Sequence, residues 1–311
     1  MSKKERWTFG DMPDQTGRIA LVTGANTGIG YETALAFAGR NATVVMACRS
    51  LEKGAEARDR ILSQAAEADV QLMHMDLGSL TSVRKFADAF RDQSDQLDLL
   101  INNAGVMVPP FTKTEDGFEL QFGVNHLGHF ALTGLLLSLI SSTPRARIVT
   151  VSSEAHRRCK IDFDNLNGEK SYSSWPFYGR SKLANLLFTN ELQRRLGAAG
   201  HSTLAIAAHP GWTATDLQRH TGLVNSLNGV FAMPSDQGAL PTLFAATAPD
   251  VSGGGFFGPD GIFNMRGYPT EVRAAGRAHD LDTAARLWQI SEQLTGVRFE
   301  FAADAPKPSA P

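Results

Sequence analysis

The chain has 311 residues, a length that suits a single α/β domain with additions, and its 42% hydrophobic content can fill a sizeable core. Its formal net charge is −2 and its basic residues are scattered, which argues against binding to nucleic acid or to an anionic membrane. The two cysteines, Cys48 and Cys159, favour a reducing compartment, and the charged N-terminus lacks the apolar region of a signal peptide. We therefore expect a cytoplasmic protein without a membrane anchor.

Short apolar runs alternate along the chain with segments of helical periodicity. The apolar runs predict strands at 19–23, 42–47, 70–75, 97–101, 147–151 and 203–208. The periodic segments predict helices at 29–40, 51–68, 79–91, 117–141 and 177–196. Strands that are apolar on both faces and are joined through helices predict a Rossmann-type, doubly wound parallel sheet of about seven strands, with helices on both faces.

No repeat or flexible linker interrupts this order, so we expect one Rossmann-type domain at 16–300. An N-terminal extension, 1–15, precedes it, and a mobile tail rich in alanine and proline, 301–311, follows it. The stretch 213–235 breaks the rhythm after the sixth strand, where ligands bind in such sheets. We interpret it as a lid over a substrate, with a plain surface excursion as the alternative.

The segment between the first strand and the first helix has the spacing Gly-x-x-x-Gly-x-Gly. Glycines allow a phosphate to approach the backbone closely, and a helix N-terminus presents free N–H groups to it. A tight turn is the bland alternative, but the position between a strand and a helix favours a dinucleotide loop. The expected contacts are Gly24, Asn26, Thr27, Gly28, Ile29 and Gly30.

The end of the second strand reads Met46-Ala47-Cys48-Arg49 and carries no acidic residue. An acid there would bind the ribose 2′-hydroxyl of NAD, whereas an arginine suits the 2′-phosphate of NADP. Arg49 therefore predicts NADP(H), unless it only caps a surface turn.

Two further strand ends carry small or polar residues that suit a bound dinucleotide. Asp76 and Leu77 follow the third predicted strand, where the carboxylate can reach an adenine amino group. Asn103, Ala104 and Gly105 follow the fourth and leave room for the chain to run beside the cofactor. Each could be an ordinary turn, but their placement at successive strand ends favours a common ligand.

Tyr178 and Lys182 lie four residues apart and share one face of a predicted helix, and Ser153 ends the fifth predicted strand. A lysine ammonium near a phenol favours the phenolate, so the pair suits proton transfer. Alone, such a pair is more often a surface contact on an amphipathic helix. The histidines show no metal-ligand spacing, so no metal site is expected.

These motifs, in this order, resemble the short-chain dehydrogenase/reductase family over roughly 16–265. The resemblance matches Asn125 to the family's catalytic asparagine and Pro210, Gly211 and Thr213 to its nicotinamide-contacting loop. It matches Ser153 to the family's serine, although Ser152 adjoins it and only the spacing to Tyr178 separates the two. Segments 45–49, 178–185 and 209–212 look like the retinol-dehydrogenase-like branch, and 284–296 is similar to soluble bacterial relatives.

The resemblance implies an NADP-dependent oxidoreductase that interconverts a hydrophobic ketone or aldehyde and an alcohol. It assigns Tyr178 as the acid/base, Ser153 to the substrate oxygen, Lys182 to the ribose and to the pKa of Tyr178, and Asn125 to a water relay. Ser153, Tyr178 and Trp212 are the expected substrate contacts.

Two alternatives use the same fold: an NADP-binding regulatory or scaffold protein, and a non-redox epimerase or dehydratase.

The apolar helices at 117–141 and 177–196 further predict a homodimer or homotetramer, unless both are covered within one chain.

Overall fold

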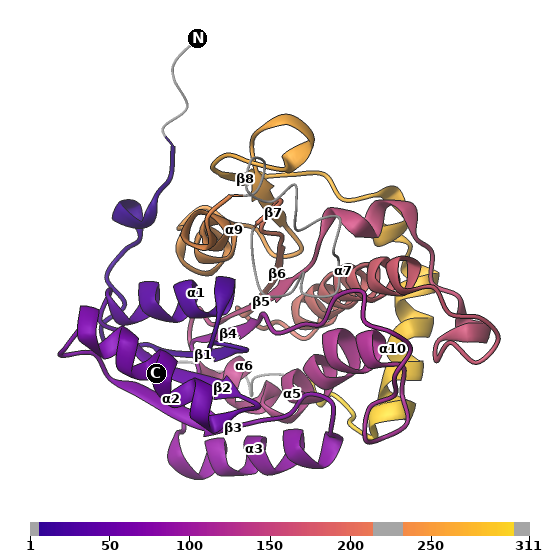
Figure 1. Ribbon diagram of the computed structural model, residues 1–311, viewed down its shortest axis with the longest axis horizontal. Coiled ribbons are helices and arrows are strands. Elements are labelled where there is room, and N and C mark those ends of the chain that lie inside the picture. The colour runs from indigo at the N-terminus through magenta and orange to yellow at the C-terminus, as the bar shows by residue number, and fades with distance from the viewer. Residues whose placement is uncertain (1–5, 214–232, 302–311) are drawn as a thin grey trace, which may run out of the picture.

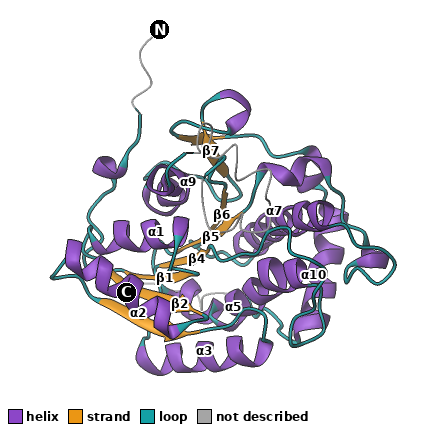
Figure 2. Ribbon diagram, viewed as in Figure 1, coloured by secondary structure: helices purple, strands orange, loops and turns teal. Residues whose placement is uncertain are grey.

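The computed structural model describes residues 6–213 and 233–301, and there the strands form one sheet between two layers of helices (Figure 2). The strands of the described chain are β1 (Ile19–Thr23), β2 (Thr43–Cys48), β3 (Val70–His74), β4 (Leu99–Asn102), β5 (Arg147–Val151), β6 (Leu204–Ala208), β7 (Phe256–Pro259) and β8 (Pro269–Glu271). Their order is β3-β2-β1-β4-β5-β6-β7-β8. Neighbours from β3 to β7 pair in parallel, and β8 pairs antiparallel with β7. The predicted doubly wound parallel sheet is therefore confirmed.

Helices cover both faces of this sheet. They are α1 (Gly28–Ala38), α2 (Leu51–Gln64), α3 (Leu80–Gln93), α4 (Leu120–Phe122), α5 (Gly128–Leu135), α6 (Leu137–Ser142), α7 (Ser174–Ala198), α9 (Ser235–Thr247) and α10 (Leu281–Thr295). Figure 1 shows α1 and α9 on one side of the strands and α3 and α5 on the other. The layers place the carboxyl ends of the strands at one edge, between the helices.

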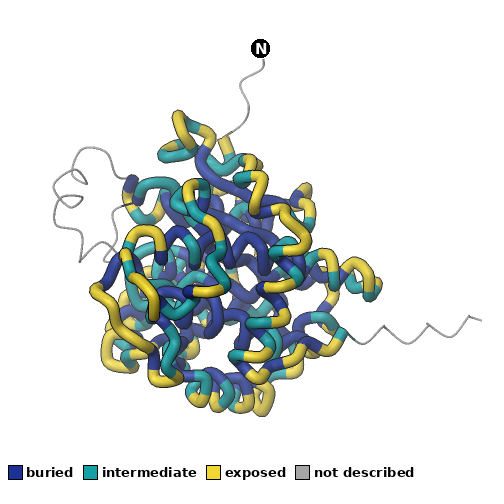
Figure 3. The backbone as a smooth tube through the Cα atoms, turned by 90° about the vertical axis from the view of Figure 1, so that its right-hand side faces the viewer, coloured by how far each residue is buried: buried dark blue, intermediate teal, exposed yellow. Residues whose placement is uncertain are grey.

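Alternate residues of each strand feed two separate apolar cores, as the two-residue period of a strand requires. In β1, Ala20 and Val22 pack in the core that includes α1 and α9, whereas Leu21 packs in the core that includes α3 and α5. Figure 3 shows the buried chain gathered in the middle of the molecule beneath an exposed rim. Burial on both faces explains why the strands read as continuous apolar runs.

Two strands at one edge of the sheet are missed by the sequence patterns. β7 follows Gly253-Gly254-Gly255 and itself contains Gly258 and Pro259, residues that normally indicate a turn. β8 has only three residues and begins at Pro269, which an edge strand tolerates because it needs no donor there. The sheet therefore has eight strands in the described chain, one more than expected.

The prediction of a single helix at 117–141 is wrong. Gly117 has a positive φ of 85° and forms a turn, and a helix begins only after Glu119, whose carboxylate accepts from the N–H groups of Gln121 and Phe122. A π-helical turn, Gly123–Leu127, then separates α4 from α5, and a further break at Leu136 separates α5 from α6. The π-helical turn matters for the site below.

Part of the N-terminal extension and of the tail is packed onto the domain. Trp7 meets Phe244 of α9 edge-on at 5.4 Å, and Met12 is buried. Phe301 lies 6.1 Å from the ring of Trp288. Residues 214–232 of the expected lid and 302–311 of the expected tail lie outside the described residues.

Candidate active site

The carboxyl ends of β1, β4 and β5 lie side by side at one edge of the sheet. Strand order changes direction between β1 and β4, because β2 and β3 lie on one side of β1 while β4 to β8 lie on the other. Ligands of doubly wound sheets bind at such a switch point. The sequence-predicted glycine loop, the segment 103–105 and Ser153 all leave the sheet at this edge.

Thr23, the last residue of β1, holds the glycine loop against the chain that follows β4. Its hydroxyl oxygen accepts hydrogen bonds from the backbone N–H groups of Asn103 and Ala104, both at 2.9 Å. The Asn103 side-chain amide donates to the carbonyl of Thr23 at 2.8 Å. His129 Nδ1 lies 3.1 Å from the carbonyl of Asn125 and so carries the proton, which leaves Nε2 to accept from the Thr23 hydroxyl at 2.9 Å. Neither Thr23 nor His129 was expected from sequence to hold the site.

The glycine loop fits a dinucleotide pyrophosphate. A Cβ atom at Gly30 would lie 2.3 Å from the carbonyl oxygen of Gly24, so only glycine lets the loop and α1 pack this closely. α1 begins at Gly28, and N–H groups of its first turn have no partner within the helix. These groups and the positive end of the helix dipole face the space that a phosphate would take.

The strand ends beside this loop carry the residues expected to meet the adenosine half. Arg49 follows β2, is exposed, and makes no hydrogen bond or ion pair with any described residue. Asp76 is half-buried, and its Oδ1 accepts from the N–H of Gly78 at 2.8 Å, while Leu77 beside it is buried. The arginine is therefore available to an anion, whereas one oxygen of the aspartate already stabilises a turn.

The structure brings Ser153 and Tyr178 together and separates Ser153 from Ser152. The Ser153 side chain lies close enough to the Tyr178 phenol to act on its pKa, which it lowers. Its hydroxyl oxygen accepts from the N–H of Ala155 at 3.2 Å. The Ser152 hydroxyl turns the other way and donates to the carbonyl of Lys182 at 2.8 Å. The chain thus offers Ser153, rather than Ser152, to a ligand beside Tyr178.

Lys182 lies one turn of α7 after Tyr178 and is equally buried. Its ammonium donates to the carbonyl of Val151 at 3.0 Å and lies 5.8 Å from the centroid of the Tyr178 ring. Gly105 passes close by: a Cβ there would lie 3.6 Å from this Nζ, in ordinary contact, and 3.1 Å from Oδ1 of Asn125.

Burial dominates the protonation of this pair. It raises the pKa of Tyr178 to about 12, against a smaller opposite effect of the Ser153 side chain, and lowers the pKa of Lys182 to about 8. The net change in the pKa of Tyr178 is therefore upward, whereas a decrease was expected, because burial is the largest influence on it. The structure favours a neutral phenol.

Asn125 projects from the π-helical turn and links two parts of the site. Its Oδ1 accepts from the N–H of Val106 at 2.8 Å, and its Nδ2 donates to the Val106 carbonyl and to the Ser181 hydroxyl, both at 2.9 Å. Ser181 donates in turn to the carbonyl of Tyr178 at 2.8 Å. The side-chain amide therefore positions the chain after β4 against α7. Ser181, which occupies the third position after Tyr178, could have been found from the helical repeat.

His156 holds the backbone of Ser153, a role that the sequence analysis did not predict. Its Nδ1 donates to the carbonyl of Ser153, with the two atoms 2.7 Å apart, and its Nε2 accepts from the N–H of Ala275 at 3.0 Å. Both ring nitrogens are thus engaged in the neutral form, which agrees with a pKa lowered by burial. Only the proximity of His156 to Ser153 in the sequence hinted at this role.

The loop expected to meet the nicotinamide follows β6. The Thr213 hydroxyl donates to the carbonyl of Pro210 at 2.9 Å, and Gly211 has a positive φ of 70°. The N–H of Trp212 donates to the carbonyl of Met265 at 2.8 Å, so the loop is held by the chain between β7 and β8. The backbone of this loop is therefore fixed at the same edge of the sheet.

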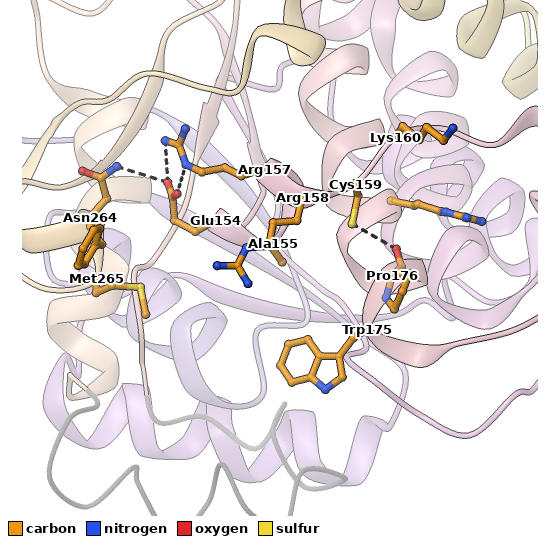
Figure 4. A pocket seen from close by; sticks show the side chains of 12 residues that line it. Glu154, Ala155, Arg157, Arg158, Cys159, Lys160, Trp175, Pro176, Asn264 and Met265 are labelled. Atoms are coloured by element: carbon orange, nitrogen blue, oxygen red, sulfur yellow. Dashed lines mark hydrogen bonds and ion pairs between the residues drawn. The ribbon is translucent and has the colours of Figure 1, made fainter.

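A cavity of about 840 Å³ opens between the segment that follows Ser153 and the start of α7, just before Tyr178. The described residues that line it are Glu154, Ala155, Arg157, Arg158, Cys159, Lys160, Trp175, Pro176, Arg180, Phe263, Asn264 and Met265. Figure 4 shows Glu154 paired with Arg157 and Asn264, with Trp175 standing apart from them. The three expected substrate contacts, Ser153, Tyr178 and Trp212, are not among these lining residues. The cavity reaches Tyr178 through Ala155 and Trp175, which both contact its ring. The size suits a small organic ligand.

None of the helices in the described part of the chain is both long enough and apolar enough to cross a membrane.

Comparison with known proteins identifies similar sequences over most of the chain. The family model for short chain dehydrogenases matches residues 18–223. Retinol dehydrogenase 12 of Mus musculus is 42% identical over 289 residues, which cover 91% of this chain and 88% of that protein. Retinol dehydrogenase 13 of Homo sapiens is 40% identical over 321 residues, which cover 98% of this chain and 93% of that protein.

Solved structures agree with this similarity. An uncharacterized protein from Mycobacterium Paratuberculosis is 44% identical, with a TM-score of 0.80 over 95% of this chain and 100% of that one. The Pseudomonas aeruginosa RhlG structure, described as an active-site complex with NADP, is 26% identical, with a TM-score of 0.65 over 81% of this chain and 98% of that one.

Proposed function

The chain belongs to the short-chain dehydrogenase/reductase family, in its retinol-dehydrogenase-like branch, and from this premise we propose that it is an NADP(H)-dependent oxidoreductase that interconverts a hydrophobic ketone or aldehyde and its alcohol. The observation that carries the proposal is the proximity of the Ser153 and Tyr178 side chains beside Lys182, at the edge of the sheet that holds the glycine loop. A proton donor and an oxygen-orienting hydroxyl beside a dinucleotide site are what carbonyl reduction requires.

The reduced nicotinamide, when bound, supplies the hydride that adds to the carbonyl carbon while the dinucleotide becomes oxidised. The Ser153 hydroxyl, whose oxygen accepts from the N–H of Ala155, would donate its proton in a hydrogen bond to the substrate oxygen. Tyr178 gives its phenolic proton to that oxygen as the carbon–oxygen double bond becomes single. Lys182 would hold the ribose hydroxyls, and its ammonium stabilises the phenolate that proton transfer leaves behind. For Asn125 we propose a part in a proton relay to Lys182. Its side-chain amide would serve this relay by positioning the chain after β4 against α7, near Lys182.

Tyr178 is the group that exchanges a proton with the substrate oxygen in this proposal. With a pKa raised to about 12, Tyr178 stays protonated at neutral pH and is ready to donate. Alcohol oxidation requires the phenolate, which burial disfavours in this structure. The protonated phenol is the form that carbonyl reduction requires.

Arg49 supports NADP(H) over NAD(H). It is exposed, lacks a partner among the described residues, and follows the strand whose end carries an acid in NAD-binding folds. RhlG, which is similar in fold, is described in complex with NADP. Both observations favour the phosphorylated coenzyme.

The direct test is an assay of nicotinamide absorbance with a panel of ketones, aldehydes and alcohols and with both coenzymes. We expect NADPH-dependent reduction of at least one apolar carbonyl compound. Binding of NADPH without turnover of any compound would favour a regulatory protein, and conversion without net change in the coenzyme would favour an epimerase or dehydratase.

A further inference from the structure

The cavity beside Tyr178 is strongly basic although the chain as a whole is not. Four of its described lining residues are cations, Arg157, Arg158, Lys160 and Arg180, against one carboxylate, Glu154. The whole chain carries a formal net charge of −2. An excess of cations gathered at one opening attracts and orients anionic ligands.

Glu154 does not neutralise this excess. Its carboxylate pairs with Arg157, accepts from Asn264 at 3.4 Å and lies 3.4 Å from Nε2 of the buried His209. Arg157 also donates to the carbonyl of Arg273. The carboxylate of Glu154 and the guanidinium of Arg157 therefore neutralise each other, and Glu154 does not compensate the other three cations.

Two of the remaining cations have no counter-ion in the described chain. Arg180 lies 3.6 Å from Asp162 and stacks over the Phe177 ring at 4.8 Å. Arg158 and Lys160 are exposed and make no hydrogen bond, ion pair or ring contact with any described residue. Their charges remain available to a ligand in the cavity that both of them line.

An apolar wall connects these cations with the proposed proton donor. Trp175 is 49% exposed, lines the cavity and stands edge-on to the Tyr178 ring at 6.4 Å. Ala155, in the segment that follows β5, lines the cavity and also packs against Tyr178. Phe263, 85% exposed, adds apolar surface at the rim. One ligand can thus meet apolar surface at one end and positive charge at the other.

We infer that this cavity binds an amphipathic substrate that carries an anionic group, with its carbonyl at Tyr178, its hydrocarbon part against Trp175 and its anion at Arg158 and Lys160. The inference rests on the proposed function for the reaction itself. The anion site is tested separately, by binding.

The binding experiment uses dodecanoate and dodecanol as probes, both below the concentration at which they aggregate, with isothermal titration calorimetry on the full chain. Dodecanoate should bind more tightly than dodecanol. Arg158→Ala/Lys160→Ala should weaken dodecanoate about tenfold and leave dodecanol unchanged, because two exposed charge contacts are lost. Arg158→Lys should retain most of the affinity, and added salt should weaken dodecanoate alone.

The matched control is Lys85→Ala/Arg298→Ala, which removes the same two charges from exposed positions that have no partner among the described residues. Equal affinity for the two probes, or an equal loss in the control, overturns the inference. Binding to phosphatidylglycerol vesicles through Arg158 and Lys160, without affinity for monomeric dodecanoate, also overturns it and assigns these cations to a bilayer surface.

A kinetic comparison separates this inference from the proposed function. We expect NADPH-dependent reduction of ω-oxododecanoate with a higher kcat/KM than that of its methyl ester, and the advantage should vanish in Arg158→Ala/Lys160→Ala. If both aldehydes are reduced equally well, the anion site is refuted while the reductase stands. If neither is reduced but dodecanoate binding behaves as described, the reductase fails while the anion site stands.

Discussion

Tyr178 and Ser153 meet because two elements end at the same edge of the sheet. Ser153 leaves β5, and Tyr178 lies near the start of α7, whose axis returns over the strands. The hydroxyl of Ser153 is oriented by one accepted bond from Ala155 and by the hold of His156 on its carbonyl. A hydroxyl fixed by its neighbours needs little reorganisation when a carbonyl oxygen arrives, and such preorganisation lowers a barrier.

Tyr178→Phe tests this arrangement at the level of one oxygen atom. The variant should lose at least about a hundredfold in kcat, because acid–base groups typically contribute that much. NADPH affinity, measured by fluorescence titration, should change little. Tyr172→Phe is the matched control, since Tyr172 lies on the adjacent segment and its hydroxyl donates to the carbonyl of Pro109 at 2.8 Å. Wild-type turnover in Tyr178→Phe would refute the proposed role.

Arg49 offers a second test at a single side chain. Arg49→Asp should raise the Kd of NADPH about tenfold or more, because a charge-assisted contact to phosphate is replaced by repulsion. The Kd of NADH should change much less. Arg298→Asp introduces the same charge change at another exposed position and should affect neither coenzyme. Equal losses for both coenzymes in Arg49→Asp would remove the 2′-phosphate argument.

The residues that sequence patterns identified in the site share one property: each lies in a local motif at a strand or helix end. The glycine loop, Asn103 and Tyr178 were recognisable in this way. Thr23 and His129 were not, because their roles depend on a contact between β1 and α5, more than a hundred residues apart in the chain. The pKa of Tyr178 was misjudged because the burial that raises it comes from tertiary packing.

At the scale of elements, the break in the expected helix 117–141 serves the site. A regular helix presents side chains at a fixed period, and a π-helical turn shifts that period. Here the turn carries Asn125 to the backbone of Val106 and to Ser181. Gly123 begins the turn and Gly128 follows it, and neither the turn nor its register could be predicted from apolar periodicity.

Helix α10 covers α7, and Trp288 is the side chain on which this packing centres. It is 2% exposed and lies against Phe130 at 5.1 Å, Phe188 at 5.8 Å and Phe299 at 4.5 Å. Arg195 of α7 stacks on the indole at 4.4 Å. Helix α10 therefore contributes to the apolar core that includes α3 and α5.

Trp288→Ala should lower the free energy of unfolding by about 3–5 kcal/mol, the usual cost of removing a large buried aromatic side chain. Urea unfolding followed by circular dichroism measures this loss. Trp175→Ala makes the same substitution at a side chain that is 49% exposed, and it should cost about 1 kcal/mol or less. Similar losses in the two variants would contradict the central place of Trp288 in the core.

At the scale of the molecule, one chain covers the helix faces that suggested an oligomer. The middle of α7, from Phe177 to Thr189, is buried except at Arg180, and α10 packs on this helix. α5 contacts both α3 and α10. The apolar character of these helices therefore follows from burial within the protomer, which is why sequence alone could not separate a dimer interface from a core.

Three buried histidines predict a loss of stability in acid. Burial lowers the pKa of His126 to about 3 and those of His129 and His209 to about 4, from an ordinary value of 6.5. As the pH falls below 6.5, the unfolded chain binds protons that the folded chain cannot accept, so stability that is fully present above 6.5 is lost. Between pH 6.5 and about pH 5, each such histidine should cost about 2 kcal/mol. Carboxylates with lowered pKa, such as Glu191, lose their stabilising contribution only at lower pH.

Urea unfolding at neutral pH and at about pH 5 tests this coupling, with a His126→Gln variant compared against the wild type. His126 Nε2 lies 2.9 Å from the Ser291 hydroxyl, so the variant is expected to be less stable at neutral pH. Its further loss on acidification should nevertheless be smaller than that of the wild type by about 2 kcal/mol, because one buried proton acceptor is gone. His74→Gln, which removes an exposed histidine on β3, is the control and should follow the wild type. If His126→Gln and the wild type lose the same free energy between the two pH values, the buried imidazole does not govern acid stability.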